Sequence, residues 1–342
     1  AAHTRFIPET ARRLADPLFT EGLHFDAYHL EQFVEKRESL LQEVLQGLDG
    51  HSKAALALIY MRNDRLESPI SLQKSEKQAL ERLASNLGGC VTALEALNGS
   101  LVLHSYASGD SIWRFKHPTI GDAYAAMLVQ NPELLDIFIQ GSAPNKLIEQ
   151  VTCGNVGIEK AVIIPKALFP LMLARLSEFS TSNAYKSAVL SAWGAKSTLQ
   201  RFLARRCSKE FLLLYLAENS DLVDWVSKPG LFLYAVTEVD LAVRLHELGL
   251  LPEDKRKKFV ATVSEYAVRG DDLYGLDDVD IKSVFEDYEF EELLQNVRTQ
   301  LLPRLSDVRI NWQLDRDSSE PPDEHMQQLL ESFETLKKNF GD

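Results

Sequence analysis

Apolar residues in the first third of the chain follow a helical spacing and then give way to two short strands. Ser52–Met61 is almost continuously apolar and is predicted to be a buried helix. Helices are also predicted over Ser75–Leu87, which a glycine pair follows, and over Thr92–Leu97. Leu101–Ala107 and Ser111–Lys116 are predicted to be strands, because a Ser-Gly-Asp turn joins them. Three helices followed by a β-hairpin is the order of a winged helix-turn-helix domain.

The rest of the chain has helical periodicity and no fixed repeat length. Short helices with short connections favour stacked helical hairpins, so the expected fold is mainly α, with a winged-helix domain, its small β-hairpin, and a solenoid-like α-helical array. The predicted helices are Asp122–Val129, Pro132–Gln140, Asn145–Gln150, Lys166–Phe179, Ala184–Trp193, Thr198–Arg206, Lys209–Ala217, Leu231–Leu248, Pro252–Val268, Val279–Gln300 and Glu324–Phe340.

These elements predict four domains. Residues 1–50 form a connector and helical lid, 51–130 the winged-helix domain, and 131–305 the helical array. Residues 306–342 form a linker and a terminal helix, because Asp307–Asp323 is polar and contains two adjacent prolines. The chain starts in polar sequence at an alanine, so we expect it to be part of a longer protein.

Charge is distributed unevenly along the chain. The net charge is −13, but residues 151–270 carry 16 basic and 12 acidic groups, whereas residues 271–342 carry 7 and 19. A uniform nucleic-acid binder does not have this composition, so nucleic acid is not an expected partner. The longest nearly apolar stretch contains Lys166 and two prolines, so no membrane span is expected. Cys90, Cys153 and Cys207 lie far apart in apolar sequence, which predicts buried, reduced thiols and a cytoplasmic protein.

Two basic clusters and one acidic segment remain as candidates for binding. Arg201, Arg205 and Lys209 are spaced to share one side of a helix, and Lys255–Lys258 is a second basic run. Without interleaved aromatic residues both fit a solvated face, or pairing with the acidic run from Asp271 to Glu292. That acidic run lacks the spacing of an EF-hand, so no metal is expected. The chain has no nucleophile elbow, zinc-protease helix or phosphate-binding loop, so it is not expected to be an enzyme by itself.

The segment Trp113–Tyr124 carries the most specific signal. It reads as a strand ending in His117, a helix started by Pro118, and Asp122 five residues after the histidine. With the preceding helices and hairpin it resembles the winged-helix module of signal-transduction ATPases with numerous domains, the STAND class. The likeness extends over roughly residues 6–130. Pro118-Thr119 departs from plant immune receptors, which have an aspartate directly after the histidine, and this favours a divergent prokaryotic branch.

This resemblance implies a function for the chain. In that class the histidine at this junction contacts the terminal phosphate of ADP in the resting state, so His117, with Asp122, would sense the nucleotide. Arg12 and Arg13 match a connector that leaves the nucleotide-binding domain. ADP and ATP would be ligands of the intact ATPase, with no cofactor in this chain.

The partners would be the missing N-terminal nucleotide-binding domain and a protein trigger, with oligomerisation on activation and a role in prokaryotic antiviral defence. The residues alone leave three alternatives open. His117 could be only a helix cap, and the chain could be a nucleic-acid-binding winged helix or a helical protein-interaction scaffold. The helix Thr92–Leu97 has no basic residue, which argues against nucleic acid.

Overall fold

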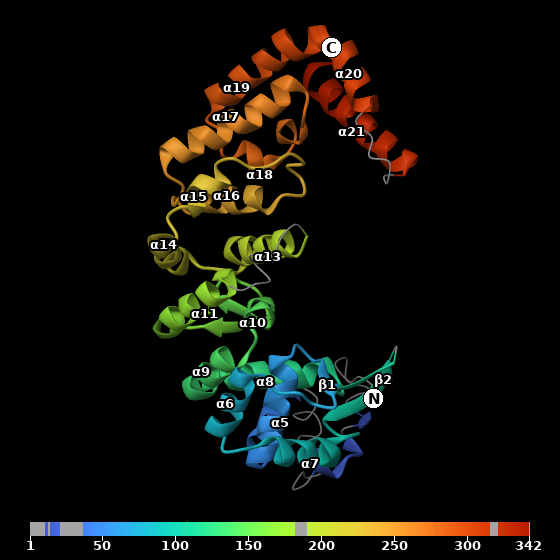
Figure 1. Cartoon of the computed structure of the whole chain (residues 1–342), viewed down its shortest axis with the longest axis vertical. Coiled ribbons are helices and arrows are strands. Elements are labelled where there is room, and N and C mark those ends of the chain that lie inside the picture. The colour runs from blue at the N-terminus through green and yellow to red at the C-terminus, as the bar shows by residue number, and fades with distance from the viewer. Residues whose placement is uncertain are drawn as a thin grey trace, which may run out of the picture. The chain divides into compact units, whose positions relative to one another are not determined.

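The computed structural model describes residues 11–12, 14–20, 37–107, 109–181, 190–314 and 321–341. The chain divides into two compact units, Ala1–Lys186 and Ser187–Asp342. The division falls inside the segment 131–305 that was predicted to be one helical array. Both units are mainly helical, as predicted (Figure 1).

The first half of unit 1 alternates helices with short strands. Its elements are α2 (Pro17–Thr20), α4 (Arg37–Gly47), α5 (Gly50–Met61), β1 (Leu66–Ser68), α6 (Lys74–Arg82), α7 (Leu87–Leu97), β2 (Val102–Ala107) and β3 (Asp110–Phe115). Asp49 caps the start of α5 by accepting the backbone N–H groups of His51 and Ser52. The apolar run that follows is buried against α7 and β3, because it has no polar face to expose to water.

The three strands form one antiparallel sheet in the order β1-β3-β2. Trp113 in the central strand lies between Leu66 of β1 and His104 of β2, and its indole stacks on the His104 imidazole with ring centroids 4.2 Å apart. Asp64 fixes the end of β3, since its Oδ1 accepts the backbone N–H of Phe115 at 2.6 Å. The predicted hairpin is confirmed, whereas β1 was not predicted.

The rest of unit 1 is helical except for one pair of strands. It contains α8 (Pro118–Gln130), α9 (Pro132–Gly141), α10 (Pro144–Gln150), β4 (Val151–Cys153), β5 (Val162–Ile164), the 3-10 turn η1 (Lys166–Leu168) and α11 (Phe169–Thr181). β4 and β5 pair in parallel, so the prediction that everything after His117 is helical is wrong at these two strands. Both strands are almost entirely buried, which explains why their apolar residues give no alternating pattern.

A second correction concerns the glycine pair that was predicted to end a helix. Gly88 and Gly89 lie in the first turn of α7, where Asn86 caps the helix by accepting the N–H of Gly89 at 2.9 Å. A β-carbon at Gly89 would lie 2.4 Å from a ring atom of His51 on α5. The glycine therefore permits α5 and α7 to pack closely, and the preceding helix, α6, ends earlier, at Arg82.

Unit 2 is a succession of helices without strands in its described residues. Its elements are α13 (Leu190–Arg206), α14 (Lys209–Glu218), α15 (Leu222–Val226), α16 (Thr237–Glu247), α17 (Glu253–Arg269), η2 (Tyr274–Leu276), α18 (Val279–Lys282), α19 (Asp287–Asn296), the π-turn η3 (Val297–Leu301), η4 (Leu302–Arg304), α20 (Leu305–Leu314) and α21 (Pro322–Phe340). α13 packs on α16, and α17 lies beside α19 (Figure 1).

Four predictions of helix bounds in unit 2 are wrong. The helices predicted over Ala184–Trp193 and Thr198–Arg206 are not separate where the structure describes them, since α13 runs without a break from Leu190 to Arg206. Helix α16 begins at Thr237 and not at Leu231, because the preceding residues form an irregular connection in which Phe232 has a positive φ of 65°. The segment predicted as one helix over Val279–Gln300 is broken between α18 and α19, where Glu286 caps the second helix. Residues 305–314, assigned mostly to a polar linker, form helix α20, because Trp312 packs on Phe333 of α21 and donates its indole N–H to the Gly270 carbonyl at 2.6 Å.

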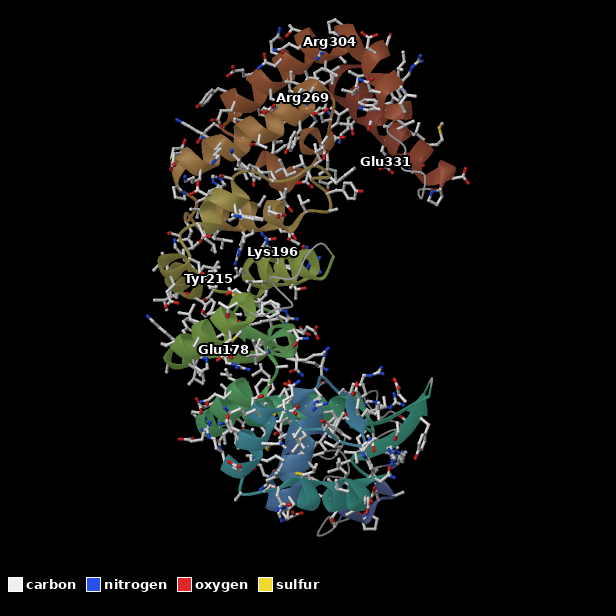
Figure 2. All side chains as sticks on the ribbon, viewed as in Figure 1. Glu178, Lys196, Tyr215, Arg269, Arg304 and Glu331 are labelled. Carbon is white, nitrogen blue, oxygen red and sulfur yellow. The ribbon has the colours of Figure 1, made fainter. Side chains whose placement is uncertain are left out.

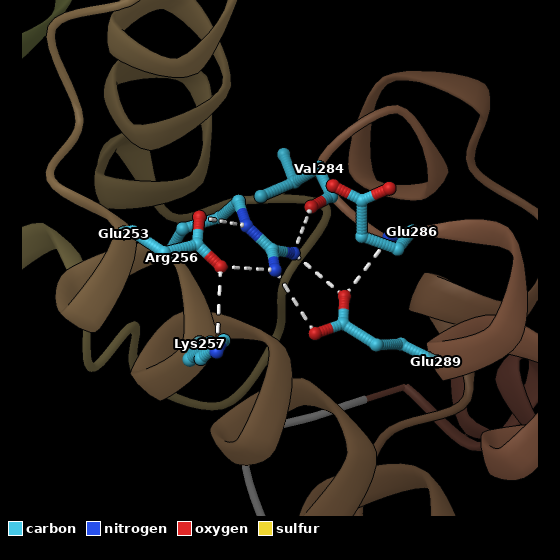
Figure 3. Close-up of polar contacts among 6 residues, drawn as sticks. All are labelled: Glu253, Arg256, Lys257, Val284, Glu286 and Glu289. Carbon is cyan, nitrogen blue, oxygen red and sulfur yellow. Dashed lines mark hydrogen bonds and ion pairs between the residues drawn. The ribbon is translucent and has the colours of Figure 1, made fainter.

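A buried arginine ties two helices of unit 2 together (Figure 3). The Arg256 side chain is 3% exposed and forms ion pairs with Glu253 on its own helix and with Glu289 on α19, at 2.8 and 2.6 Å. It also donates to the carbonyl oxygen of Val284 at 2.9 Å. The predicted alternative that the basic run Lys255–Lys258 pairs with the acidic run after Asp271 therefore holds for Arg256. The three lysines of the run pair instead with Asp224, Glu253 and Asp254.

Candidate functional site

The candidate site lies at the junction between β3 and α8 in unit 1. Strand β3 ends at Phe115 and helix α8 begins at Pro118, so only Lys116 and His117 separate them. The N–H of Lys116 donates to the carbonyl of Leu101 at 3.0 Å, which keeps the backbone attached to the hairpin up to the junction. Pro118 occupies the first helical position, where its lack of an N–H costs nothing. The backbone therefore fixes the position of His117 from both sides.

His117 is the N-cap residue of α8 and is half-buried. Its Nδ1 accepts the backbone N–H of Thr119 at 3.3 Å and lies 3.0 Å from the Thr119 hydroxyl oxygen. An imidazole nitrogen that accepts an N–H carries no proton, so the ring proton of neutral His117 belongs on Nε2. Within the described part of the chain Nε2 has no hydrogen-bond partner. The ring therefore presents one N–H donor beyond the helix end.

Asp122 lies one turn into the same helix and is paired. Its Oδ2 is 2.7 Å from Nζ of Lys160, which belongs to the connection between β4 and β5. Lys160 has a φ of 61°, an unusual backbone conformation for lysine that the connection imposes. The Lys160 side chain is 59% exposed and that of Asp122 is 29% exposed, so the pair faces solvent and contributes little to stability. Its effect is to place a cation over the first turns of α8.

Aromatic side chains pack around α8 near Asp122. Tyr60 of α5 packs against Tyr124 of α8 and Phe138 of α9, with ring centroids 5.2 and 5.3 Å apart. Burial raises the pKa of Tyr60 well above its usual range, and the nearby negative charge of Asp122 adds to the shift. Both tyrosines are therefore neutral, rigid packing groups at any physiological pH. They pack α8 against α5 and α9, whereas polar residues such as His117 lie at its N-terminal end.

Of the two arginines of the predicted connector, Arg13 lies outside the described residues. Arg12 is half-buried, and its carbonyl accepts the N–H of Ala15 at 3.1 Å, just before α2. Helix α2 packs on α4, and α4 packs on α8, the helix that His117 caps.

The basic face predicted in unit 2 does not lie on one helix. Arg201 and Arg205 belong to α13, whereas Lys209 is the first residue of α14, because Ser208 caps a new helix by accepting the N–H of Phe211. Arg205 is also partly neutralised by Asp240, 2.9 Å away. The i, i+4, i+8 spacing assumed one continuous helix, which the break at Cys207-Ser208 interrupts.

The exposed residues of helix α7 lack positive charge. They are Gly88, Val91, Thr92, Glu95 and Ala96.

In the acidic loop after α17, Asp272 accepts the N–H groups of Leu233, in the connection before α16, and of Tyr274. Among the described residues, no three histidine, cysteine or acidic side chains are grouped closely enough to hold a metal ion.

Sequence reasoning found His117 and Asp122 but missed Lys160. The lysine is 38 positions from Asp122, and no sequence motif links the two residues. They meet because the parallel pairing of β4 and β5 brings the loop of Lys160 to α8.

The cysteines are buried and free of disulfide bonds, as predicted. No helix in the described ranges combines the length and apolar content needed to cross a bilayer. The chain matches no protein-family model, no curated protein and no solved structure.

Proposed function

We propose that this chain is the regulatory part of a STAND-type nucleotide switch, in which His117 senses the nucleotide held by a separate nucleotide-binding domain. The order α5-β1-α6-α7-β2-β3, with β1 paired to β3, supports a winged-helix domain in unit 1. The position of His117 directly after this domain supports its equivalence to the histidine of that class.

The observation that carries the proposal is the choice of residue at the start of α8. Some helices in the described part of the chain are capped by preferred residues such as Asp49 and Asn131, and others begin without a capping side chain, for example at Val236. His117 differs from both kinds, because its Nδ1 caps the helix while its Nε2 keeps an N–H donor without a partner among the described residues. A cap that also carries such a donor can serve a ligand as well as the fold.

The chemistry required of His117 is a hydrogen bond from Nε2 to a phosphate oxygen. A charged acceptor strengthens such a bond, and the positive end of the α8 dipole favours an anion at the same place. If only the resting state places ADP against His117, the bond biases the switch toward rest.

Unit 2 would then detect the trigger, which we take to be a protein, and restrain oligomerisation until the trigger binds. A role in prokaryotic antiviral defence is part of the same proposal. The acidic charge of residues 271–342 and the lack of basic residues on the exposed face of α7 disfavour the alternative of a nucleic-acid-binding winged helix.

The proposal is tested on the protein encoded by the complete gene. We expect a phosphate-binding loop in the reading frame before Ala1 and ADP that copurifies with the protein. His117→Asp should keep the helix cap, remove the side-chain N–H donor, and raise activity without the trigger. One charge-assisted hydrogen bond is worth roughly 1.5–3 kcal/mol, so the resting population should fall by about ten- to a hundred-fold.

The matched control is His51→Asp, since His51 is another histidine in the first turn of a helix in unit 1, where its Nδ1 bonds to Ser85 at 2.8 Å. This control should retain ADP and remain at rest. An upstream sequence without a phosphate-binding loop would sink the proposal, and so would equal behaviour of the two variants.

A further inference from the structure

Three aromatic side chains of unit 2 form an exposed group far in sequence from the proposed sensor. Phe232 and Tyr234 lie in the connection between α15 and α16 and are 60% and 61% exposed, and Tyr274 in η2 is 41% exposed. The rings meet edge to face, with centroids 6.3 Å apart between Phe232 and Tyr234 and 6.0 Å apart between Tyr234 and Tyr274. We call these three rings the aromatic surface.

The backbone holds these rings outward through one carboxylate. Asp272 accepts the N–H of Leu233 at 2.8 Å through Oδ2 and the N–H of Tyr274 at 2.9 Å through Oδ1. Leu233 is only 2% exposed and anchors the connection in the core, so its two neighbours in the sequence point to solvent. Tyr266 strengthens the arrangement by donating its hydroxyl to the Pro229 carbonyl at 2.8 Å. The aromatic surface is therefore a fixed feature of the fold.

Phe232 has a strained backbone conformation. Its φ of 65° lies in the left-handed region, which is costly for a bulky side chain. The ring gains little burial in return, because it is 60% exposed. Neither packing nor local geometry explains why a phenylalanine occupies a position suited to glycine or asparagine.

Carboxylates surround the tyrosine end of the aromatic surface. The neighbouring Asp278 carboxylate raises the pKa of Tyr274, and burial and the charges of Asp280 and Asp240 raise it further. Asp240 is paired with Arg205, whereas Asp280 is exposed at the start of α18. The segment 271–280 contains five aspartates and no basic residue. A cation is therefore attracted to this surface, and phosphate groups are repelled.

Other aromatic rings in unit 2 already carry cations of the same chain. Lys196, labelled in Figure 2, lies over the Trp225 ring at 4.7 Å from its centroid, and Lys282 lies over Phe290 at 5.1 Å. In the described part of the chain no cation lies over the three rings of the aromatic surface. These rings have the same chemistry as the occupied ones, and their place is open.

We propose that the aromatic surface binds an arginine-bearing segment of a protein partner. A guanidinium group is planar and weakly hydrated, so it stacks on aromatic faces while its N–H groups reach carboxylates such as Asp278 and Asp280. Nucleic acids and anionic membranes are excluded by the negative charge of the same region. This inference is independent of the nucleotide switch, since it rests on residues of unit 2 alone.

The test uses the whole chain and three labelled peptides of glycine and serine that carry three arginines, three lysines or three citrullines. Fluorescence polarisation at low ionic strength should show the arginine peptide binding more tightly than the lysine peptide. The citrulline peptide, which keeps the planar shape without the charge, should bind at least about ten-fold more weakly. A citrulline peptide that binds as tightly as the arginine peptide would overturn the proposal, and so would no binding at millimolar concentration.

Variants of the protein separate the rings from the general acidity of unit 2. Phe232→Gly and Tyr234→Ala should each weaken binding of the arginine peptide by about two- to five-fold. Phe232→Gly should melt at or above the parent temperature, because glycine accepts the left-handed conformation. A loss of binding in a variant that is at least as stable cannot be attributed to misfolding.

Tyr288→Ala is the matched control, since Tyr288 of α19 is 62% exposed in the same acidic unit. It should bind the arginine peptide as the parent does. Equal binding by the parent, Phe232→Gly and Tyr234→Ala would show that unit 2 attracts cations without using these rings, and would refute the proposal.

Discussion

Replacing His117 with asparagine or alanine measures how well the imidazole serves as a helix cap. In the isolated chain, His117→Ala removes the acceptor for the N–H of Thr119, whereas His117→Asn supplies a better one. We expect the asparagine variant to be at least as stable as the parent and the alanine variant to be less stable. The order of the three proteins is the prediction.

The magnitude follows from the capping distances. Nδ1 of His117 accepts from Thr119 at 3.3 Å, beyond the usual range, whereas Asn131 accepts two N–H groups at 3.1 Å through one oxygen at the start of α9. Replacing a good cap with alanine costs about 0.5–2 kcal/mol, so the long bond of His117 places its loss near the lower end. Asparagine should gain a few tenths of a kcal/mol over histidine. For a unit of this size 1 kcal/mol corresponds to about 2–4 °C in melting temperature.

Differential scanning calorimetry of the three proteins at one fixed pH measures these shifts. Hydrogen exchange at Thr119 and Ile120 assigns the change to the first turn of α8. A His117→Asn variant that melts several degrees below His117→Ala would refute the reasoning. It would mean that the imidazole makes structural contacts that asparagine cannot replace, and that His117 is not a weak cap.

The isolated chain should not bind ATP at micromolar concentration, because it has no glycine-rich loop and lysine to hold the phosphates; a calorimetric titration with a micromolar Kd would contradict this. Random duplex DNA should not bind either, and a salt-dependent mobility shift abolished by changes in Thr92–Leu97 would show otherwise. Arg256→Met should lower the free energy of unfolding of unit 2, measured by urea denaturation, by about 3–5 kcal/mol, because it leaves the buried Glu289 carboxylate unpaired. Arg269→Met, on the exposed side of the same helix, should lower it by less than about 1 kcal/mol. The Arg256 guanidinium also lowers the pKa of Glu289 below its usual 4.5. The stability from this pair is therefore present above pH 4.5 and is lost as the pH falls through the folded pKa. The melting temperature of Glu289→Gln should lack this part of the pH dependence between pH 6 and 3.

Helices and the hairpin were predictable because their signals are local. Pro118 and Pro132 mark helix starts, and the periodic apolar residues mark the buried faces. β1, β4 and β5 have three residues each, too few for a periodic pattern, and they exist because a partner strand offers its edge. Helix α20 is polar and was assigned to a linker, since only its packing through Trp312 shows that it belongs to the fold.

The candidate site was only partly predictable for the same reason. His117 follows a strand and precedes a proline, a pattern that the sequence displays directly. Lys160 reaches Asp122 through a tertiary contact, and the strain at Phe232 depends on where Leu233 is anchored. The error at Lys209 arose because its spacing from Arg205 is also compatible with two successive helices, and Ser208 starts the second one.

The pairing of β1 with β3 has a consequence for the order of folding. β2 and β3 are adjacent in the sequence, so their hairpin can form on a timescale of microseconds by itself. β1 joins only after a long loop closes, because Asp64 beside β1 bonds to Phe115 across 51 positions. The hairpin that leads to His117 should therefore form early, and the edge strand that completes the sheet should form late. Under native conditions β1 is then the part of the sheet that opens first, while the hairpin and the start of α8 stay together.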